Sequence, residues 1–165
     1  TVGDMVLVDL GATLQGYCSD ITRTYVFGTP TPRQRQLWEL ERQAQTAAFA
    51  AARIGATCGV VDAAARQVLT EAGFGPDYQV PGLPHRTGHG LGLDIHEEPY
   101  ILRGSDTLLQ PGMCFSIEPM LCVYGECGVR LEDIVCMTAD GPRWFVPPSK
   151  HLEAPFNAAE IEALP

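Results

Sequence analysis

Residues 85 to 97 read HRTGHGLGLDIHE and hold three of the four histidines of the chain, His85, His89 and His96. Imidazole nitrogens bind Mn, Fe, Co and Zn, so this cluster could hold a metal. Phosphate binding is an alternative, because GHGLG contains part of a GxGxxG pattern, and packing as ordinary core histidines is another. A phosphate loop opens a long helix, and no helical pattern follows here. The glycines are therefore expected to let the backbone pass close to a crowded site.

Four carboxylates lie in segments that otherwise read as apolar strands. Asp9 ends the run MVLVDL, and Asp20 follows eleven residues later in the next strand, across a tight turn. Glu118 in FSIEPML and Glu132 in VRLEDIV repeat the arrangement, fourteen residues apart. A buried carboxylate without a partner costs free energy or shifts its pKa until the group is neutral. These acids therefore need partners.

Pairing with arginine is the simpler explanation for the four carboxylates. Only Arg23 and Arg130 are near them in sequence, so two arginines would have to serve four acids. Two divalent cations about 3.5–4 Å apart could instead be bridged by the carboxylates, with a histidine completing the ligand set. The sequence therefore favours a two-metal site over a set of ion pairs.

The strands that must position these carboxylates are indicated by apolar runs and alternation. Residues 5–10 read as a core strand, and residues 17–27 as its antiparallel partner across the turn ATLQG. Residues 113–121 and 128–138 read as a second pair of long strands. The two pairs are expected to bring their acids together.

The remaining regular segments are expected to be helices. The residues TPRQ at 31–34 form a capping box with a proline in the first turn, and the apolar stripe that follows ends near Gly55. A second stripe runs from about 60 to 72. A further capping box at 157–160 predicts a short C-terminal helix. The expected fold class is α+β, in a single domain spanning residues 1–165.

Composition limits the classes of function. The net charge of −9 disfavours binding to nucleic acid or to an anionic membrane surface. The sequence holds no run of 18 apolar residues that could span a membrane, and its first residues do not show the pattern expected of a signal peptide. The six cysteines form no CxxC motif, so reduced thiols are expected rather than a disulfide framework or a zinc site.

Four segments together resemble the metallopeptidases of pita-bread fold. They are VDLGATLQGYCSDITRT, HRTGHGLGLDIHEEP, SIEP and GVRLEDIV. The likeness is greatest to Xaa-Pro dipeptidase (prolidase) and aminopeptidase P. Methionine aminopeptidases are less similar, because they lack the RxED pattern. The resemblance covers about residues 3 to 140, and the ligand order Asp, Asp, His, Glu, Glu is specific.

The resemblance implies a role for each matching residue. The metal ligands would be Asp9, Asp20, His89, Glu118 and Glu132. Asp20 and Glu132 would bridge the two metals.

Other residues match positions of the family that face the substrate. His85 and His96 resemble histidines that contact the substrate and stabilise the transition state. Arg130 matches an arginine of the prolidase and aminopeptidase P branch, and Arg103 is a loose match to a clamp for the substrate carboxylate.

The implied reaction is hydrolysis of the imide bond before proline in dipeptides or short peptides. Two divalent metals, Mn first and Co, Zn or Fe as alternatives, would lower the pKa of a bridging water and give a hydroxide nucleophile. Glu118 would carry the proton to the leaving nitrogen, and His96 would hydrogen-bond the oxyanion. The resemblance also implies a homodimeric, cytoplasmic enzyme in full-length form.

Several alternatives remain open from the sequence. The chain could act as an aminopeptidase P on longer Xaa-Pro peptides, as a non-catalytic pita-bread binding module, or as a metal-independent hydrolase similar to creatinase. The chain opens directly on a strand, so it is expected to be the C-terminal part of a catalytic domain. The family's N-terminal domain and a further active-site histidine would lie upstream. Alone, this part is expected to bind metal weakly or not at all and to be inactive.

Overall fold

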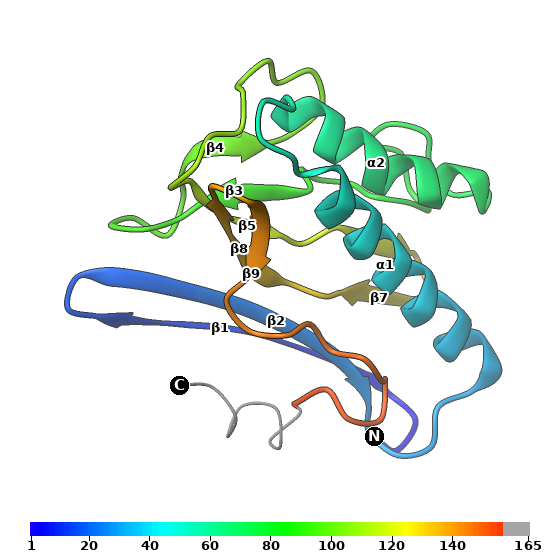
Figure 1. Ribbon diagram of the computed structural model, residues 1–165. Helices are drawn as coiled ribbons and strands as arrows, with labels where there is room; N and C mark the ends of the chain where they lie inside the picture. The colour runs from blue at the N-terminus through cyan, green and yellow to red at the C-terminus, as the bar shows by residue number, and fades with distance from the viewer. Residues whose placement is uncertain (157–165) are drawn as a thin grey trace.

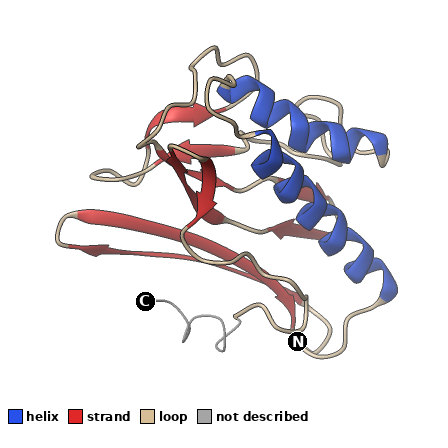
Figure 2. Cartoon of the chain, viewed as in Figure 1, coloured by secondary structure: helices blue, strands red, loops and turns tan. Residues whose placement is uncertain are grey.

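The computed structural model describes residues 1–156 and shows two helices packed side by side along a curved antiparallel sheet, above a long hairpin (Figures 1 and 2). The elements in chain order are β1 (Met5–Leu14), β2 (Tyr17–Val26), α1 (Pro32–Ala51), α2 (Cys58–Glu71), β3 (Gly88–Gly90), β4 (Glu97–Ile101), β5 (Cys114–Ile117), β6 (Met120–Val123), β7 (Cys127–Arg130), β8 (Asp133–Thr138) and β9 (Gly141–Trp144).

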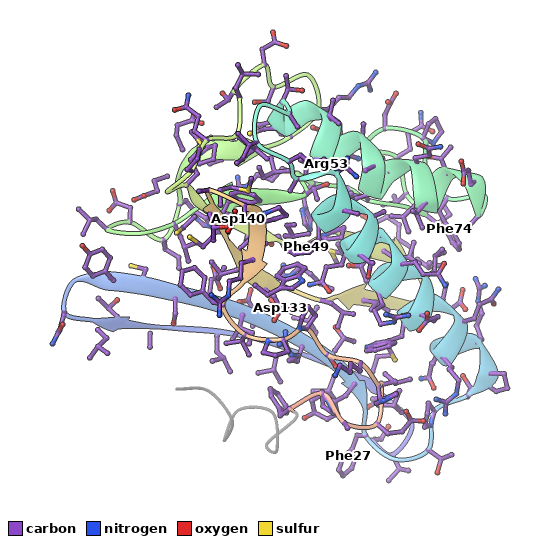
Figure 3. All side chains as sticks on the ribbon, in the orientation of Figure 1. Phe27, Phe49, Arg53, Phe74, Asp133 and Asp140 are labelled. Carbon is purple, nitrogen blue, oxygen red and sulfur yellow. The ribbon has the colours of Figure 1, made fainter. Side chains whose placement is uncertain are left out.

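The strands form one five-stranded sheet and two hairpins. The sheet has the order β4-β3-β5-β8-β9, and the hairpins are β1-β2 and β6-β7. The pairings are antiparallel. The apolar core lies between the helices and the sheet (Figure 3), where Phe49 of α1 stacks on Trp144 of β9 with ring centroids 4.3 Å apart. The predicted α+β class is confirmed.

The first hairpin has the predicted antiparallel pairing but is longer than predicted. Gln15 and Gly16 form its turn with φ values of 52° and 87°, and a two-residue turn with both φ values positive matches the twist of the strands. The prediction of a core strand at 5–10 is wrong, because Leu7 and Leu10 are 38% and 51% exposed. In the two-stranded sheet, β1 has β2 as its one neighbour.

Both predicted helices are present, with ends that differ by a few residues. The capping box forms as expected: Thr31 Oγ1 accepts from the backbone amide of Gln34, and the Gln34 side chain accepts from the backbone amide of Thr31. The first helix ends at Ala51 rather than near Gly55, and the second spans Cys58–Glu71. The C-terminal helix predicted at 157–160 lies outside the described residues.

The two long strands predicted at 113–121 and 128–138 are each broken in the structure, so that prediction is wrong. The β5–β8 ladder ends at the pair Ile117 and Asp133, and the chain then enters β6 and β7. The amide of Glu118 donates to Thr87 O at 2.7 Å, and the amide of Glu132 donates to Thr22 O at 3.1 Å. The breaks therefore lift both glutamates out of the ladder.

The glycines of the histidine cluster are required by close packing of backbone. A Cβ at Gly88 would lie 2.0 Å from Ser116 O, and one at Gly90 would lie 2.4 Å from Glu98 O. Both distances are far shorter than a van der Waals contact. The expected role of the glycines is confirmed, and the stretch that follows β3 is not helical.

Two further findings concern the chain as a whole. Within residues 1–156, no helix is long and apolar enough to cross a membrane. The six cysteines are free thiols, of which Cys58 is buried and the others are half-buried.

Candidate metal centre

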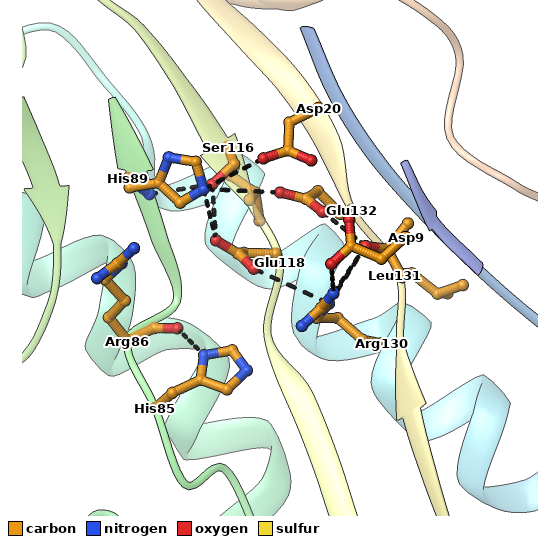
Figure 4. Close-up of polar contacts among 12 residues, drawn as sticks. Asp9, Asp20, His85, Arg86, His89, Ser116, Glu118, Arg130, Leu131 and Glu132 are labelled. Carbon is orange, nitrogen blue, oxygen red and sulfur yellow. Dashed lines mark hydrogen bonds and ion pairs between the residues drawn. The ribbon is translucent and has the colours of Figure 1, made fainter. Parts of the chain in front are cut away.

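The five predicted ligands come together at one place, although three lie in different strands and two in the breaks between strands (Figure 4). Their ligand atoms form overlapping groups in which all atoms lie within 4.8 Å of one another. One group contains His89 with Glu118 and Glu132, and another contains Asp9 with Asp20 and Glu132. Glu132 belongs to both groups, so it is placed where a carboxylate could bridge two ions.

Thr22 connects the first hairpin to the strand break that carries Glu132. Thr22 lies opposite Asp9 in the β1–β2 register, and it also forms an isolated antiparallel bridge with Glu132. The Thr22 hydroxyl donates to Glu132 Oε2 at 2.6 Å. Backbone pairing thus sets Asp9 and Glu132 on either side of one residue, which explains how the hairpin delivers its acids to the sheet.

The imidazole of His89 is oriented by a backbone carbonyl. Its Nδ1 lies 3.0 Å from Gly90 O, and because a carbonyl can only accept, Nδ1 carries the proton. Nε2 is then the free ligand atom. It lies 3.1 Å from Glu118 Oε1, 3.7 Å from Asp20 Oδ2 and 3.8 Å from Glu132 Oε1. This is the arrangement in which a histidine binds metal through one nitrogen while the other is held by the protein.

The crowding of ionisable groups in the cluster shifts their pKa values. Burial and then the charge of Glu118 raise the pKa of Glu132 to about 8, and burial together with Asp9 raises the pKa of Asp20. Burial opposes ionisation of both Glu118 and His89. Their mutual contact outweighs it, so the pKa of Glu118 is lowered and that of His89 is raised. Without a cation, the acids can ionise together only at a cost.

Arginine pairing relieves this repulsion only in part. Arg23 pairs at 2.6 Å with Asp133, which is not one of the four acids. Arg130 pairs with Asp9 and lies 3.9 Å from Glu118. Within residues 1–156, Oε1 of Glu132 is buried with no hydrogen-bond partner. An unpaired buried carboxylate oxygen among four acids and an imidazole fits a site for divalent cations.

His96, which was predicted to contact substrate, lies directly beside the ligand cluster. The centroids of the His96 and His89 rings lie 4.3 Å apart, with the rings edge to face. His96 also belongs to a candidate ligand group with Asp20 and His89. The side chain is exposed. Its position allows contact either with a cation or with a bound substrate.

His85 is held in one tautomer on the opposite wall. Its Nδ1 contacts Arg86 O, so Nδ1 carries the proton and Nε2 presents a lone pair. Burial lowers the pKa of His85, which keeps the ring neutral at pH 7. Within the described residues, Nε2 is buried and without a partner. A neutral imidazole of this kind accepts a hydrogen bond from a ligand.

A cavity of about 560 Å³ opens over these groups. Its lining includes three residues that the sequence did not single out, Tyr78, Arg86 and Leu102. Arg103, the predicted clamp, is not among the lining residues. Its exposed side chain pairs with Asp77 at a separate surface hollow. The structure therefore brings together the other predicted site residues but not Arg103.

Arg66 of α2 shapes the wall that carries Tyr78 and His85. Its guanidinium donates to Leu83 O at 3.0 Å and to His85 O at 2.6 Å, and it lies 4.2 Å from the centre of the Tyr78 ring. Asp62 pairs with the same guanidinium at 2.6 Å. No motif in the sequence marks Arg66, because its partners are backbone carbonyls brought near by the fold.

Glu41, on the buried face of α1, is expected to make the stability of the fold depend on pH. Burial raises the pKa of Glu41 well above its ordinary value, and within residues 1–156 neither of its carboxyl oxygens has a hydrogen-bond partner. The folded state therefore keeps a proton that the unfolded chain loses above about pH 4.5. Stability is lost as pH rises from there towards the raised pKa.

Replacing Glu41 with Gln should remove this dependence on pH. We expect Glu41→Gln to stabilise the protein by about 1–3 kcal/mol at pH 8 and to have little effect near pH 4. Thermal unfolding at a series of pH values measures both. Glu71→Gln, at an exposed position of α2, is the matched control. A gain that is equal at all pH values would contradict the explanation.

Comparison with known proteins agrees with this geometry. A family model described as metallopeptidase family M24 matches residues 1–139. The chain is 54% identical over 140 residues to a probable dipeptidase PepE of Mycobacterium tuberculosis and 45% identical over 150 residues to an Xaa-Pro dipeptidase of Lactobacillus helveticus. These matches cover 84% and 91% of this chain but only 36% and 39% of the relatives' lengths.

A solved structure gives the same result for the fold. The prolidase from Thermococcus sibiricus superimposes with a TM-score of 0.85 at 40% identity, over 93% of this chain and 40% of that one. The similarity thus extends over nearly all of the described residues. The chain belongs to metallopeptidase family M24 and has the pita-bread fold of its prolidases.

Proposed function

We propose that the full-length protein hydrolyses the Xaa-Pro bond of dipeptides with two divalent cations. The single observation that carries the proposal is the convergence of two Asp, two Glu and one His on one cavity, with a Glu132 oxygen left unpaired. Relatives named Xaa-Pro dipeptidase support the choice of substrate. Release of proline from Ala-Pro by the full-length protein with Mn²⁺ tests it, and no release would contradict it.

Cations bound here would polarise the scissile carbonyl and lower the pKa of water towards neutrality. The chain itself must then move a proton. In the proposal, Glu118 takes one from the attacking water as the C–O bond forms, and gives it to the proline nitrogen as the C–N bond breaks. Its Oε1 is held 3.1 Å from the Ser116 hydroxyl, which orients the carboxylate. The imide nitrogen has no proton of its own, so it leaves only if protonated.

The two histidines outside the buried ligand set have different roles in the proposal. His96 is exposed beside His89 and can donate to the oxygen that becomes negative in the transition state. His85 is neutral and offers the lone pair of Nε2, so it can accept a hydrogen bond from a donor on the substrate. One ring thus stabilises charge, and the other orients the peptide.

Arg86 replaces Arg103 in the proposal as the group that binds the substrate carboxylate. Arg86 lines the cavity, and its guanidinium lies 5.2 Å from the centre of the Tyr100 ring. Within residues 1–156 its buried Nε has no hydrogen-bond partner. A planar guanidinium that is held in one orientation can bind the C-terminal carboxylate of a substrate through two hydrogen bonds. Only a short substrate such as a dipeptide has this carboxylate close to the scissile bond. Arg103 already pairs with Asp77.

Arg86→Leu is expected to raise KM for Ala-Pro by about 10–100-fold with little change in kcat, because a charged hydrogen bond is lost. The effect should vanish with Ala-Pro amide, which has no carboxylate. Arg103→Leu is the matched control and should change KM less than about 3-fold, since its ion pair is exposed. The reverse result for the two arginines would return the clamp to Arg103.

Activity on longer peptides is the second candidate function. A clear preference for longer Xaa-Pro peptides over Ala-Pro would favour an aminopeptidase P. Manganese as the metal, a homodimeric assembly and a cytoplasmic location remain predictions from the family resemblance.

A further inference from the structure

Gln45 lies on α1, outside the cavity, yet its side chain reaches both strand breaks that carry the catalytic glutamates. It is 1% exposed. Its Nε2 donates to Ile117 O at 3.3 Å and to Leu131 O at 3.2 Å. Ile117 directly precedes Glu118, and Leu131 directly precedes Glu132. One amide group thus spans the two points at which the chain leaves the β5–β8 ladder.

The same nitrogen also donates to Asp133 Oδ2 at 3.0 Å. The other oxygen of Asp133 accepts from Arg23 at 2.6 Å, and Arg23 donates in turn to Glu132 O at 2.8 Å. The backbone carbonyls of Leu131 and Glu132, which flank the Cα of Glu132, are therefore held by one connected network, Gln45–Asp133–Arg23. All three side chains are buried, so water does not compete for these contacts.

The helix is itself fixed against the rest of the site. The indole of Trp38, two turns before Gln45 on the same buried face, donates to Thr24 O of β2 at 2.9 Å. Helix α1 therefore holds the hairpin that carries Asp20 and the breaks that carry the two glutamates. A rigid element of this kind can set the separation between them.

We infer that Gln45 is a positioning residue that fixes Glu118 relative to Glu132, and thereby sets the geometry of the metal centre. The inference rests on the proposed function, because it needs these glutamates to bind metal. An amide has two N–H donors, and here they are shared among three acceptors, so no other polar side chain of the same length supplies the same contacts. Glutamate would offer a single donor and only when protonated.

Binding of Mn²⁺ to the full-length protein, measured by titration calorimetry, tests the inference without depending on activity. Gln45→Met keeps the shape and removes the donors, and we expect it to weaken binding of at least one Mn²⁺ by about 10–100-fold, as loss of a ligand-orienting contact does elsewhere. Gln45→Glu should fall between Gln45→Met and the wild type, and it serves as the second variant if Gln45→Met does not fold.

Two controls separate positioning from stability. Gln43→Met changes an exposed glutamine on the same helix and should leave Mn²⁺ binding unchanged. Ala44→Gly, in the buried face, lowers the melting temperature without touching either break and should also leave it unchanged. The inference is overturned if Gln45→Met and Gln45→Glu both bind Mn²⁺ as the wild type does, or if Ala44→Gly weakens binding equally. If the wild type itself binds no Mn²⁺, the proposed function fails instead.

Discussion

Replacing Glu118 with Gln is expected to lower kcat on Ala-Pro by about 10³-fold or more. Glu118 is 8% exposed and its Oε1 lies 3.1 Å from His89 Nε2. Glutamine keeps the volume of the side chain but can neither accept the proton of the attacking water nor deliver it to the leaving nitrogen. It also removes one negative charge from the ligand set, so metal affinity should fall in the same variant.

The measurement must separate these two losses. Steady-state kinetics at saturating Mn²⁺, with metal content determined on the same sample, gives the loss of kcat at full occupancy. Glu126→Gln is the matched control, because Glu126 is exposed and pairs with Arg33 on the surface. A fully metallated Glu118→Gln variant with kcat within a few fold of the wild type would remove Glu118 as the proton carrier.

Chelation of the metals is expected to reduce activity to background and to lower the melting temperature. Four carboxylates converge with ligand atoms within 4.8 Å in overlapping groups, and burial together with their mutual repulsion raises the pKa of Asp20 and Glu132. Cations that bind only the folded state stabilise it by mass action, about 2.7 kcal/mol at a concentration 100 times Kd. Both effects should be reversed by adding Mn²⁺.

Asp20→Asn extends the test to one of the two carboxylates predicted to bridge the metals. It should lower metal content and activity together, whereas Asp94→Asn, at an exposed position of the histidine segment, should change neither. Full activity after metal removal would instead support a metal-independent hydrolase. Bound metal with no detectable turnover would support a binding module.

The candidate ligands could be predicted from the sequence, because acidic residues in segments that read as buried strands imply a free-energy cost of burying their charge. Glu118 and Glu132 interrupt apolar runs, Asp20 lies inside a segment that reads as a strand, and the chain offers too few nearby arginines to neutralise these acids. The glycines at 88 and 90 likewise stand where any Cβ would meet backbone oxygen. Acids within strands and closely spaced glycines both depart from what local structure favours, and such departures are expected at functional sites.

The broken strands could not be predicted in the same way. The apolar pattern of 113–121 continues through the break, and only Pro119 hints at it. The break exists because the amides of Glu118 and Glu132 bond to Thr87 and Thr22, which are distant in sequence. Hydrophobic periodicity records which side chains are buried, but it does not record which carbonyl a given amide will meet.

The sequence by itself predicted the candidate ligand set, and it determined the two helices, the pairing of the first hairpin and the family. These depend on residue types and local spacing, which are present in the chain before it folds. The tertiary structure decided that Arg86 lines the cavity and that Arg103 does not, and it revealed that Gln45 spans both breaks. Those features depend on where backbone carbonyls and neighbouring side chains lie in space. Residue types and local spacing do not show which groups distant in sequence will come into contact.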